Sequence, residues 1–444
     1  MDHRDTIFAP ATGQGLSGVA IIRVSGPGAS LALQAICGLS SLEPRRSIRC
    51  RMVDPETGDL LDKGLALWFP GPNSFTGEDV AELHIHGGRA TLGAVCSALG
   101  GLRDPVSRGF RFADPGEFSR RALENGKMDL SEIEALSDLV QAETEAQRRQ
   151  ALRQMEGALG DRIEEIRVGL LNTLARLEAA IDFPDEDLPD DLFAEIDRNI
   201  LEVKGTVAQY IAGSERGERI REGLRVAIVG APNVGKSSLL NALAGRDAAI
   251  VSERAGTTRD VVEVRLDLGG FAVTVADTAG LRESEDSIER EGVRRAEVVA
   301  RSADLRLVVY DGSTGLDGAA RAFLGADSIT VCNKIDLGCE GVPGEDAVFV
   351  SARTGQNVDA LIGVLTARVS ELLGGAGGVP LTRERHRIAL QLCLEGLDRA
   401  GATDSVDLKA EDLRLAVSAL GRITGRVDVE DVLDVIFSEF CIGK

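Results

Sequence analysis

The chain has 444 residues, which is room for about two to four domains. Its formal net charge of −21 argues against a broad cationic groove for a nucleic-acid backbone. The seven cysteines are an odd number without CxxC or zinc-type spacing, which indicates free thiols in a reducing compartment. Met1–Arg4 carry no apolar signal segment, and no apolar run approaches about 18 residues, so we expect a cytoplasmic protein without a membrane span.

Residues 1–115 alternate short strand-like runs with Gly- and Pro-rich turns and one or two helices. The runs are Val19–Val24, Leu65–Phe69, Val80–His86 and Phe110–Phe112. This pattern predicts an α+β domain. In a strand over 80–86, alternation places Glu82, His84 and His86 on one face. Such a face could hold a metal ion, but a metal site needs a further ligand that the sequence does not supply.

From about Pro115 apolar residues recur at three- and four-residue steps, which predicts helices. Gly157 and Gly160 are expected to kink or split the first long helix, and the acidic stretch 183–189 to end it. Residues 116–221 hold 14 Lys and Arg against 24 Asp and Glu, so much of the negative charge lies here. The helical pattern resumes after the glycine-rich stretch 374–378. We expect one helical domain, 116–220 plus 375–444, interrupted by an inserted domain over 221–374; two independent helical domains are the alternative.

The inserted domain contains a phosphate-binding signature. Gly230–Ser237 follows an apolar strand-like run, 224–229, and precedes a helical run, 238–243. Its backbone amides and the helix N-terminus form a positive concavity for phosphate oxygens. Lys236 would bind the β- and γ-phosphates, and the Ser237 hydroxyl would ligate Mg²⁺. This predicts a Ras-like P-loop domain with a doubly wound α/β sheet.

Four companion motifs specify the nucleotide. Asp277–Gly280 ends the strand-like run 271–275, and Ala255–Thr258 has the threonines of a switch segment. Asp336, in Asn333–Asp336, would accept the N1 and N2 protons of guanine, which adenine lacks. Ser351–Arg353 would lie against the same base. The sequence therefore predicts GTP binding.

Leu281 follows the Asp277–Gly280 motif, where Ras-like proteins carry a glutamine that orients water. Asn233, in the P-loop, is placed to ligate a monovalent cation that would take over part of this work. The alternative is that Asn233 serves only as a turn residue after Pro232. The acidic run 282–290 is a solvated segment, or one of its carboxylates orients the attacking water.

Motifs across the whole chain resemble the MnmE (TrmE) family of tRNA-modification GTPases, in the TrmE/Era/Der-like P-loop superfamily. The motifs are Asp5–Ile7, Gly18–Gly26, Asn73–Asp79, Pro115–Ser119, Ala180–Pro184 and the tail Phe440–Lys444. The resemblance implies an N-terminal folate-binding and dimerisation domain over 1–115, a discontinuous helical domain, and an inserted G domain over 221–374.

The resemblance also implies an activity. Family members form homodimers and work with the flavoprotein MnmG (GidA) in a heterotetramer or larger complex. They add a carboxymethylaminomethyl or aminomethyl group to C5 of the wobble uridine of certain tRNAs. A tetrahydrofolate derivative (5-formyl or methylene) is the one-carbon donor, and K⁺-stimulated GTP hydrolysis drives conformational change. The tRNA would be held largely by the partner.

Site residues carried over by motif fall into four groups. The GTP site comprises Asn233, Val234, Gly235, Lys236, Ser237, Ser238, Ser252, Glu253, Arg254, Ala255, Gly256, Thr257, Thr258, Asp277, Thr278, Ala279, Gly280, Asn333, Lys334, Ile335, Asp336, Ser351, Ala352 and Arg353. Within it, Ser237 and Thr258 would ligate Mg²⁺, and Asn233, Ser252, Arg254 and Thr257 would ligate K⁺. The catalytic residue is Glu289. The folate site comprises Arg23, Glu82, Lys127 and Lys444.

Two alternatives stay open at this point. Cys441 is a nucleophile or redox participant beside the one-carbon donor, or a small residue that packs the tail. The chain as a whole could instead be a GTP-switched RNA-binding or ribosome-assembly factor of the Era/Der type, without modification chemistry. Such a protein would have no need of residues 1–115 or of the terminal motif.

Overall fold

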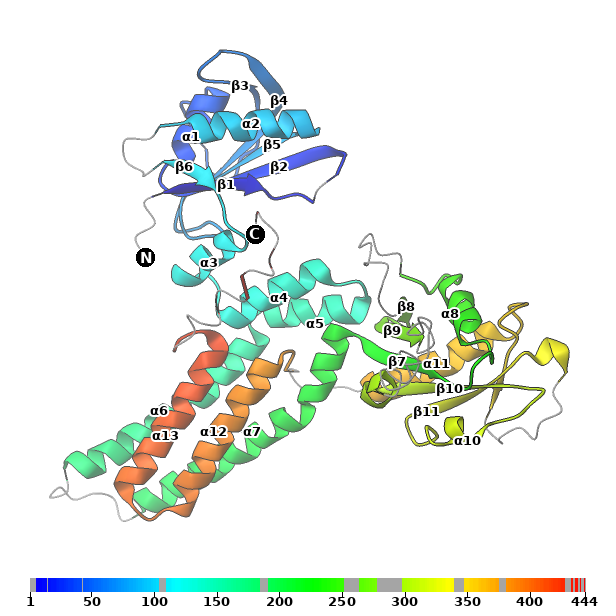
Figure 1. Cartoon of the computed structure of the whole chain (residues 1–444). Coiled ribbons are helices and arrows are strands. Elements are labelled where there is room, and N and C mark those ends of the chain that lie inside the picture. Colours follow the sequence, from blue (N-terminus) through cyan, green and yellow to red (C-terminus); the bar gives the residue numbers. More distant parts are fainter. Residues whose placement is uncertain are drawn as a thin grey trace, which may run out of the picture. The chain divides into compact units, whose positions relative to one another are not determined.

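The computed structural model describes residues 5–13, 15–41, 43–103, 109–183, 191–250, 263–277, 298–338, 347–374 and 381–427, with Leu433, Ile436, Phe437, Phe440 and Gly443. The chain divides into two compact units. Figure 1 labels the helices and strands of both. The first comprises Met1–Ser137, Gly160–Arg167 and Leu420–Lys444, and the second comprises Asp138–Leu159 and Val168–Ala419. No helix in the described ranges is long and apolar enough to cross a membrane.

The first unit contains a six-stranded sheet in the order β3-β4-β5-β2-β1-β6. The strands are β1 (Thr6–Pro10), β2 (Ser17–Ser25), β3 (Ile48–Val53), β4 (Leu60–Phe69), β5 (Val80–Gly87) and β6 (Phe110–Phe112). Neighbours are antiparallel, except that β1 and β6 are parallel. Helices α1 (Ala29–Cys37) and α2 (Arg89–Gly101) share one hydrophobic core with the sheet. This is the α+β arrangement that the sequence predicts.

The two faces of this sheet differ in character. On β5, Ala81, Leu83 and Ile85 are buried in the core beneath α1 and α2, while Glu82 and His84 lie half-buried on the opposite face. The predicted alternation is therefore confirmed. On that opposite face Phe118 of α3 (Glu117–Glu124) packs in a cluster with residues of β1. α4 (Leu130–Gln141) follows α3 in the chain.

Long helices make up part of the second unit. Three of them, α5 (Glu145–Met155), α7 (Leu192–Glu222) and α12 (Glu384–Ala402), lie wholly within it, whereas α6 (Ala158–Asp182) and α13 (Val406–Thr424) also include residues of the first unit. Gly157, in the left-handed conformation at φ 84°, separates α5 from α6, whereas Gly160 lies inside α6. The predicted split therefore falls at Gly157. α7 and α12 pack along each other, and Lys204 on α7 forms an ion pair with Asp398 on α12 (2.5 Å).

The second unit also contains a six-stranded sheet in the order β12-β11-β10-β7-β9-β8, in which only β8 is antiparallel to its neighbour. The strands are β7 (Leu224–Val229), β8 (Glu263–Leu268), β9 (Phe271–Asp277), β10 (Leu305–Asp311), β11 (Ser328–Asn333) and β12 (Val348–Phe349). Helices α8 (Lys236–Ala244) and α11 (Val358–Leu373) cover one face, and α10 (Gly318–Arg321) packs on the other. Helices on both faces of a mostly parallel sheet are the predicted doubly wound arrangement.

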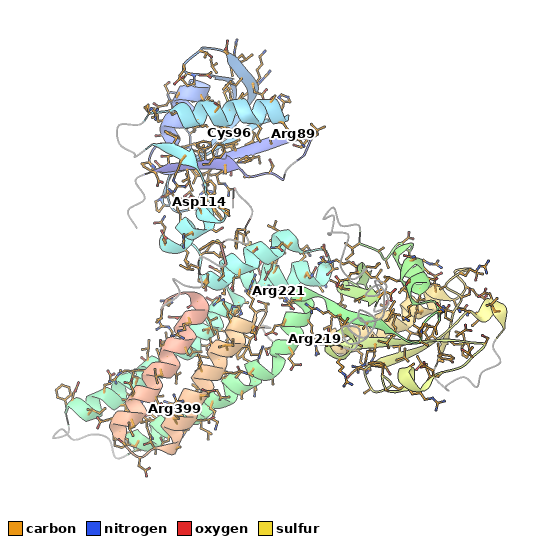
Figure 2. The ribbon with its side chains drawn as sticks, viewed as in Figure 1. Arg89, Cys96, Asp114, Arg219, Arg221 and Arg399 are labelled. Atoms are coloured by element: carbon orange, nitrogen blue, oxygen red, sulfur yellow. The ribbon has the colours of Figure 1, made fainter. Side chains whose placement is uncertain are left out.

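Both ends of the α/β domain contact the C-terminal end of the long helix α7. α7 runs directly into β7 through Gly223. Arg219 lies near the end of α7 (Figure 2) and forms an ion pair with Asp304 (Nε to Oδ1, 2.8 Å). Arg216 on the same helix donates a hydrogen bond to the carbonyl of Leu373, at the end of α11 (2.8 Å). The first strand of the α/β domain, β7, and the end of its last helix, α11, therefore both lie beside the end of α7.

Candidate functional site

The P-loop connects the end of β7 to the start of α8, at the edge where the parallel strands end. Gly230 and Gly235 both have positive φ, 154° and 96°. A Cβ on Gly230 would lie 2.1 Å from the carbonyl oxygen of Val309, and one on Gly235 would lie 2.4 Å from Nδ2 of Asn333. Only glycine fits at these two positions, because both the backbone conformation and the space exclude a side chain.

Charged and hydroxyl groups converge on this loop. Nζ of Lys236 donates to the carbonyls of Gly230 and Ala231, at 2.9 and 2.8 Å, so its ammonium lies directly over the loop. The Ser237 hydroxyl donates a hydrogen bond to the carboxylate of Asp277, at the end of β9. Hydroxyl and carboxylate oxygens are the donors that Mg²⁺ prefers, and the pair fits one such ion. Ser238 continues α8, and Val234 is buried beneath the loop.

The side chain of Asn333 connects the P-loop to the loop that follows β12 by two hydrogen bonds. Its Nδ2 donates to the carbonyl of Val234 (2.8 Å), and its Oδ1 accepts from the backbone N–H of Ala352 (3.0 Å). The side chain is 1% exposed, so both bonds are made without competition from water. Asn333 therefore acts as a bridge between the phosphate loop and the loop that carries Ser351 and Arg353.

Lys334 and Asp311 form a second link to the P-loop. Nζ of Lys334 donates to the Asn233 carbonyl (2.6 Å) and to Oδ2 of Asp311 (2.7 Å). Partial burial alone would raise the pKa of Asp311, but hydrogen bonds from Lys334 and Ser313 outweigh it and hold this pKa below its usual value. The Asp311 carboxylate therefore stays charged and keeps the lysine aligned along the loop. Asn233 has a left-handed φ of 63°.

Asp336 is placed as a base-reading acceptor. It lies in the 3₁₀ turn Ile335–Leu337 after β11, and its Oδ1 accepts a hydrogen bond from the buried Ser351 hydroxyl (2.7 Å). The rest of this exposed carboxylate is open to solvent, as a group that takes two N–H donors of a base requires. The predicted residues of the P-loop, the Asn333–Asp336 motif and the Ser351–Arg353 motif thus come together at one edge of the sheet.

Several predicted site residues lie outside the described residues. They are Ser252, Glu253, Arg254, Ala255, Gly256, Thr257, Thr258, Thr278, Ala279, Gly280, Glu289, Cys441 and Lys444. Leu281 also lies outside the described residues. Their placement in the GTP and folate sites stays a prediction.

A second site lies in the N-terminal sheet. A cavity of about 430 Å³ opens on the face that carries Glu82. Its lining residues are Arg23, Arg45, Phe69, Asn73, Ser74, Phe75, Val80, Glu82 and Lys127. Arg23 forms a double hydrogen bond with Oε1 of Glu82, from Nη2 at 3.0 Å and from Nε at 3.2 Å. Three of the four residues predicted for the folate site, Arg23, Glu82 and Lys127, thus line one cavity.

Neighbouring side chains hold the ion pair between Arg23 and Glu82 in place. The guanidinium of Arg23 lies over the rings of Phe75 and Phe118, 5.0 and 5.8 Å from their centroids. Nε2 of His84 lies 3.4 Å from the other carboxylate oxygen of Glu82. Cation–π contacts and the ion pair fix the guanidinium plane, so this end of the cavity is preorganised.

A buried network supports the segment 73–78, whose residues Asn73, Ser74 and Phe75 line the cavity. Arg121, which is fully buried, bonds to Asp5 (3.0 Å), Glu78 (3.2 Å) and Glu117 (2.9 Å). Glu78 in turn accepts from the Ser25 hydroxyl (2.7 Å). Burial alone would raise the pKa of Glu117, but hydrogen bonds from Arg111, the Asp114 N–H and Arg121 outweigh it and lower this pKa. These charges keep this segment in place.

The metal alternative for the Glu82 face finds no support. His86 is paired with Asp62 instead (Nδ1 to Oδ1, 2.8 Å), away from Glu82 and His84. Within the described ranges, no group of three or more His, Cys, Asp or Glu side chains could hold a metal ion. Glu82 lines the cavity, and His84 contacts the Glu82 carboxylate.

Sequence reasoning missed part of this cavity. Asn73, Ser74 and Phe75 belong to a motif that marks the family, yet no role was predicted for them. Arg45 and Phe69 lie in segments without any motif, and they reach the cavity only because β4 pairs with β5. The spacing of residues along the chain offers no signal for such contacts.

The fold and the first site define a P-loop GTPase that carries additional domains on both sides of its G domain. Residues 6–127 match the family model described as GTP-binding protein TrmE N-terminus, and residues 130–441 match the one described as MnmE helical domain. The chain belongs to the MnmE family of tRNA modification GTPases. Membership decides against the Era/Der-type alternative without modification chemistry.

Individual relatives agree. A protein of Parvibaculum lavamentivorans named tRNA modification GTPase MnmE is 55% identical over 446 residues, which cover 99% of this chain and 100% of the relative. A protein of the same name from Paramagnetospirillum magneticum is 52% identical over 447 residues, with the same two shares. A crystal structure of an Aquifex aeolicus Era variant bound to GDP.AlF4- is 27% identical, covers 41% of this chain and 68% of that chain, and has a TM-score of 0.26. That score is too low to add to the fold assignment.

Proposed function

We propose that this chain hydrolyses GTP and, with the flavoprotein MnmG, adds a carboxymethylaminomethyl or aminomethyl group to C5 of the wobble uridine of certain tRNAs. A tetrahydrofolate derivative bound in the N-terminal cavity is the one-carbon donor. The observation that carries the proposal is that one chain holds both a P-loop with a guanine-type acceptor and a cavity lined by Arg23, Glu82 and Lys127. The two sites have different chemistry, which suits an enzyme that couples nucleotide hydrolysis to a second reaction.

At the first site, the loop amides and Lys236 stabilise the negative charge that develops on the transferred phosphoryl group. The hydroxyl of Ser237, close to the Asp277 carboxylate, fits a Mg²⁺ ion. Thr258 would supply a further hydroxyl ligand, and a bound Mg²⁺ would neutralise part of the negative charge of the phosphates. Asp336 selects guanine, because its carboxylate would remain unpaired against adenine, at a cost of about 1–3 kcal/mol.

Hydrolysis is assisted by a monovalent cation and by a carboxylate. Asn233 lies in the P-loop, and Lys334 donates a hydrogen bond to its backbone carbonyl. The backbone from which the Asn233 side chain extends is therefore held in place. With Ser252, Arg254 and Thr257 it would hold K⁺, which supplies positive charge where other GTPases use an arginine. An added charge of this kind is worth about 10³–10⁵ in rate. Glu289 orients the attacking water.

At the second site, Glu82 accepts two N–H bonds from the pterin ring, while Arg23 holds the carboxylate in position. The polar lining and the size of the cavity fit a ring of this kind. Lys127 and Lys444 would bind the remainder of the folate, and Cys441 would either take part in the one-carbon chemistry or only pack the tail. The chain acts as a homodimer through the N-terminal domain, and the acidic surplus of 116–221 leaves tRNA binding largely to the partner.

The first test is GTP turnover by the full chain in KCl and in NaCl at equal ionic strength. We expect strong stimulation by K⁺ that Asn233→Ala removes. Equal rates in both salts would overturn the cation mechanism and leave GTP binding intact. Modification is tested with the flavoprotein partner and tRNA by nucleoside mass spectrometry. Deletion of Phe440–Lys444 should preserve GTP hydrolysis and abolish modification; unchanged modification would overturn the role of the tail.

A further inference from the structure

The charges that line the N-terminal cavity do not balance. The lining has three cationic side chains, Arg23, Arg45 and Lys127, and a single carboxylate, Glu82. Arg23 is neutralised by Glu82 at 3.0 Å. Arg45 and Lys127 form no ion pair with any carboxylate among the described residues. The cavity therefore carries two uncompensated positive charges in a chain whose net charge is −21.

The two uncompensated cations lie at a different depth from the ion pair. The side chains of Arg23 and Glu82 are only 21% and 16% exposed, whereas Arg45 and Lys127 are exposed residues. The neutral, hydrogen-bonding end of the cavity is thus the inner end, and the cationic end is its rim. A ligand that matches this order has a polar ring system at one end and negative charge at the other.

Arg45 is positioned by the protein and is not a freely moving surface side chain. Its backbone N–H donates to the carbonyl of Trp68 (2.8 Å), and its φ of 61° is in the left-handed region. Nη2 donates to the carbonyl of Asn73, and Cζ lies 5.9 Å from the centroid of the Phe69 ring. Non-glycine residues held in this conformation concentrate at ligand sites. The remaining guanidinium donors have no partner in the described part of the chain, and two parallel donors match one carboxylate.

We propose that Arg45, together with Lys127, binds the carboxylates of the ligand's acidic tail and makes the cavity selective for folates over pterins without such a tail. The inference rests on the proposed folate site and extends it, since it assigns Arg45 as a specificity-determining residue. A glutamate tail has two carboxylates, one for each uncompensated cation. Neither cation contacts the reacting carbon, so their role is in binding and not in the chemistry.

The experiment compares two ligands of the same shape on the full chain. One is 5-formyltetrahydrofolate, and the other is its diamide, in which both tail carboxylates are neutral amides. Binding is measured by isothermal titration calorimetry and by quenching of Trp68, the single tryptophan of the chain, whose carbonyl contacts Arg45. We expect the wild type to bind the acid at least about tenfold more tightly than the diamide, as for a charge-assisted bond at a partly exposed site.

Arg45→Gln should weaken binding of the acid about tenfold and leave binding of the diamide unchanged, which also shows that the variant is folded. Arg46→Gln is the matched control, because Arg46 is adjacent in sequence, pairs with Glu43 and does not line the cavity. It should change neither affinity. Equal weakening of both ligands by Arg45→Gln, or no weakening of either, would overturn the assignment of Arg45. If the wild type binds neither ligand, the folate site itself is wrong.

Discussion

Replacement of Asn333 by alanine tests whether the motif asparagine is a structural bridge within the GTP site. Its amide makes two buried hydrogen bonds, to the Val234 carbonyl at 2.8 Å and from the Ala352 N–H at 3.0 Å. Alanine leaves both backbone groups without partners. Each such loss costs about 1–3 kcal/mol, and entry of water into the small gap recovers part of it. We therefore expect a loss of about 2–4 kcal/mol in the free energy of unfolding of the G domain.

The assay is differential scanning calorimetry of the full chain without nucleotide. For a domain of this size, the expected loss lowers Tm by about 5–15 °C. Hydrogen exchange adds a local readout, because the Ala352 amide should lose more of its protection than the amides of α11 do. Asn241→Ala is the control: Asn241 is an exposed residue on α8 in the same domain, and its replacement should shift Tm by less than about 2 °C.

A small shift in Tm would refute the reasoning. If Asn333→Ala lowers Tm no more than Asn241→Ala and the Ala352 amide exchanges at the wild-type rate, the bridge contributes nothing to stability. A loss of nucleotide affinity without a loss of stability would have the same meaning, since it would make Asn333 a ligand only.

Three further outcomes are expected. Asp336→Asn should weaken GTP binding at least about 100-fold and favour XTP, because an amide donates where guanine needs an acceptor; a competition titration of the two nucleotides decides. Gly235→Ala should abolish nucleotide binding, since its Cβ would lie 2.4 Å from Nδ2 of Asn333 at a φ of 96°; measurable affinity near the wild-type value would contradict this. Glu117 has a pKa below its usual 4.5, because hydrogen bonds from Arg111 and Arg121 outweigh its burial, so its contribution to stability is present above pH 4.5 and is lost as pH falls through the lower folded-state pKa. Arg121→Met should therefore destabilise the first unit by about 3–5 kcal/mol at pH 7 and by less near pH 4, as judged by urea unfolding; equal losses at both pH values would count against it.

Much of the fold could be predicted because each element carries its own local signal. The apolar run 224–229 and the glycines of the P-loop gave β7, the loop and α8, and Gly157 marked the break between α5 and α6. No strand is predicted at β1, β3, β8, β10 or β12. Of these, β3, β8 and β12 are edge strands, whose pairing partners decide their conformation. The parallel pairing of β1 with β6 joins segments about a hundred residues apart, which periodicity does not reveal.

The GTP site and the cavity of the N-terminal domain also differ in how far the sequence predicts them. Motif residues of the GTP site contact one another: Asn333 bonds to Val234, and Ser351 bonds to Asp336. Since each of these residue types is required by its contact with the others, the site can be recognised from the motifs in the sequence. The cavity of the N-terminal domain imposes weaker requirements, because a cation or an aromatic ring satisfies each position and such residues occur on every surface. Arg45 could be found only once the pairing of β4 with β5 had brought its neighbours together.

That difference bears on how substitutions at the two sites should act. At the GTP site a single change removes contacts on which several motif residues depend, so stability and nucleotide affinity should fall together. At the cavity rim the two cations act on the ligand separately, because no contact joins Arg45 to Lys127 in the described ranges. Their effects on binding should therefore add, as they do for independent positions, with the Arg45→Gln and Lys127→Gln double variant losing the product of the two single losses. Titration of the four proteins with the acid measures this directly, and a double loss equal to either single loss would mean that both side chains act on the same carboxylate.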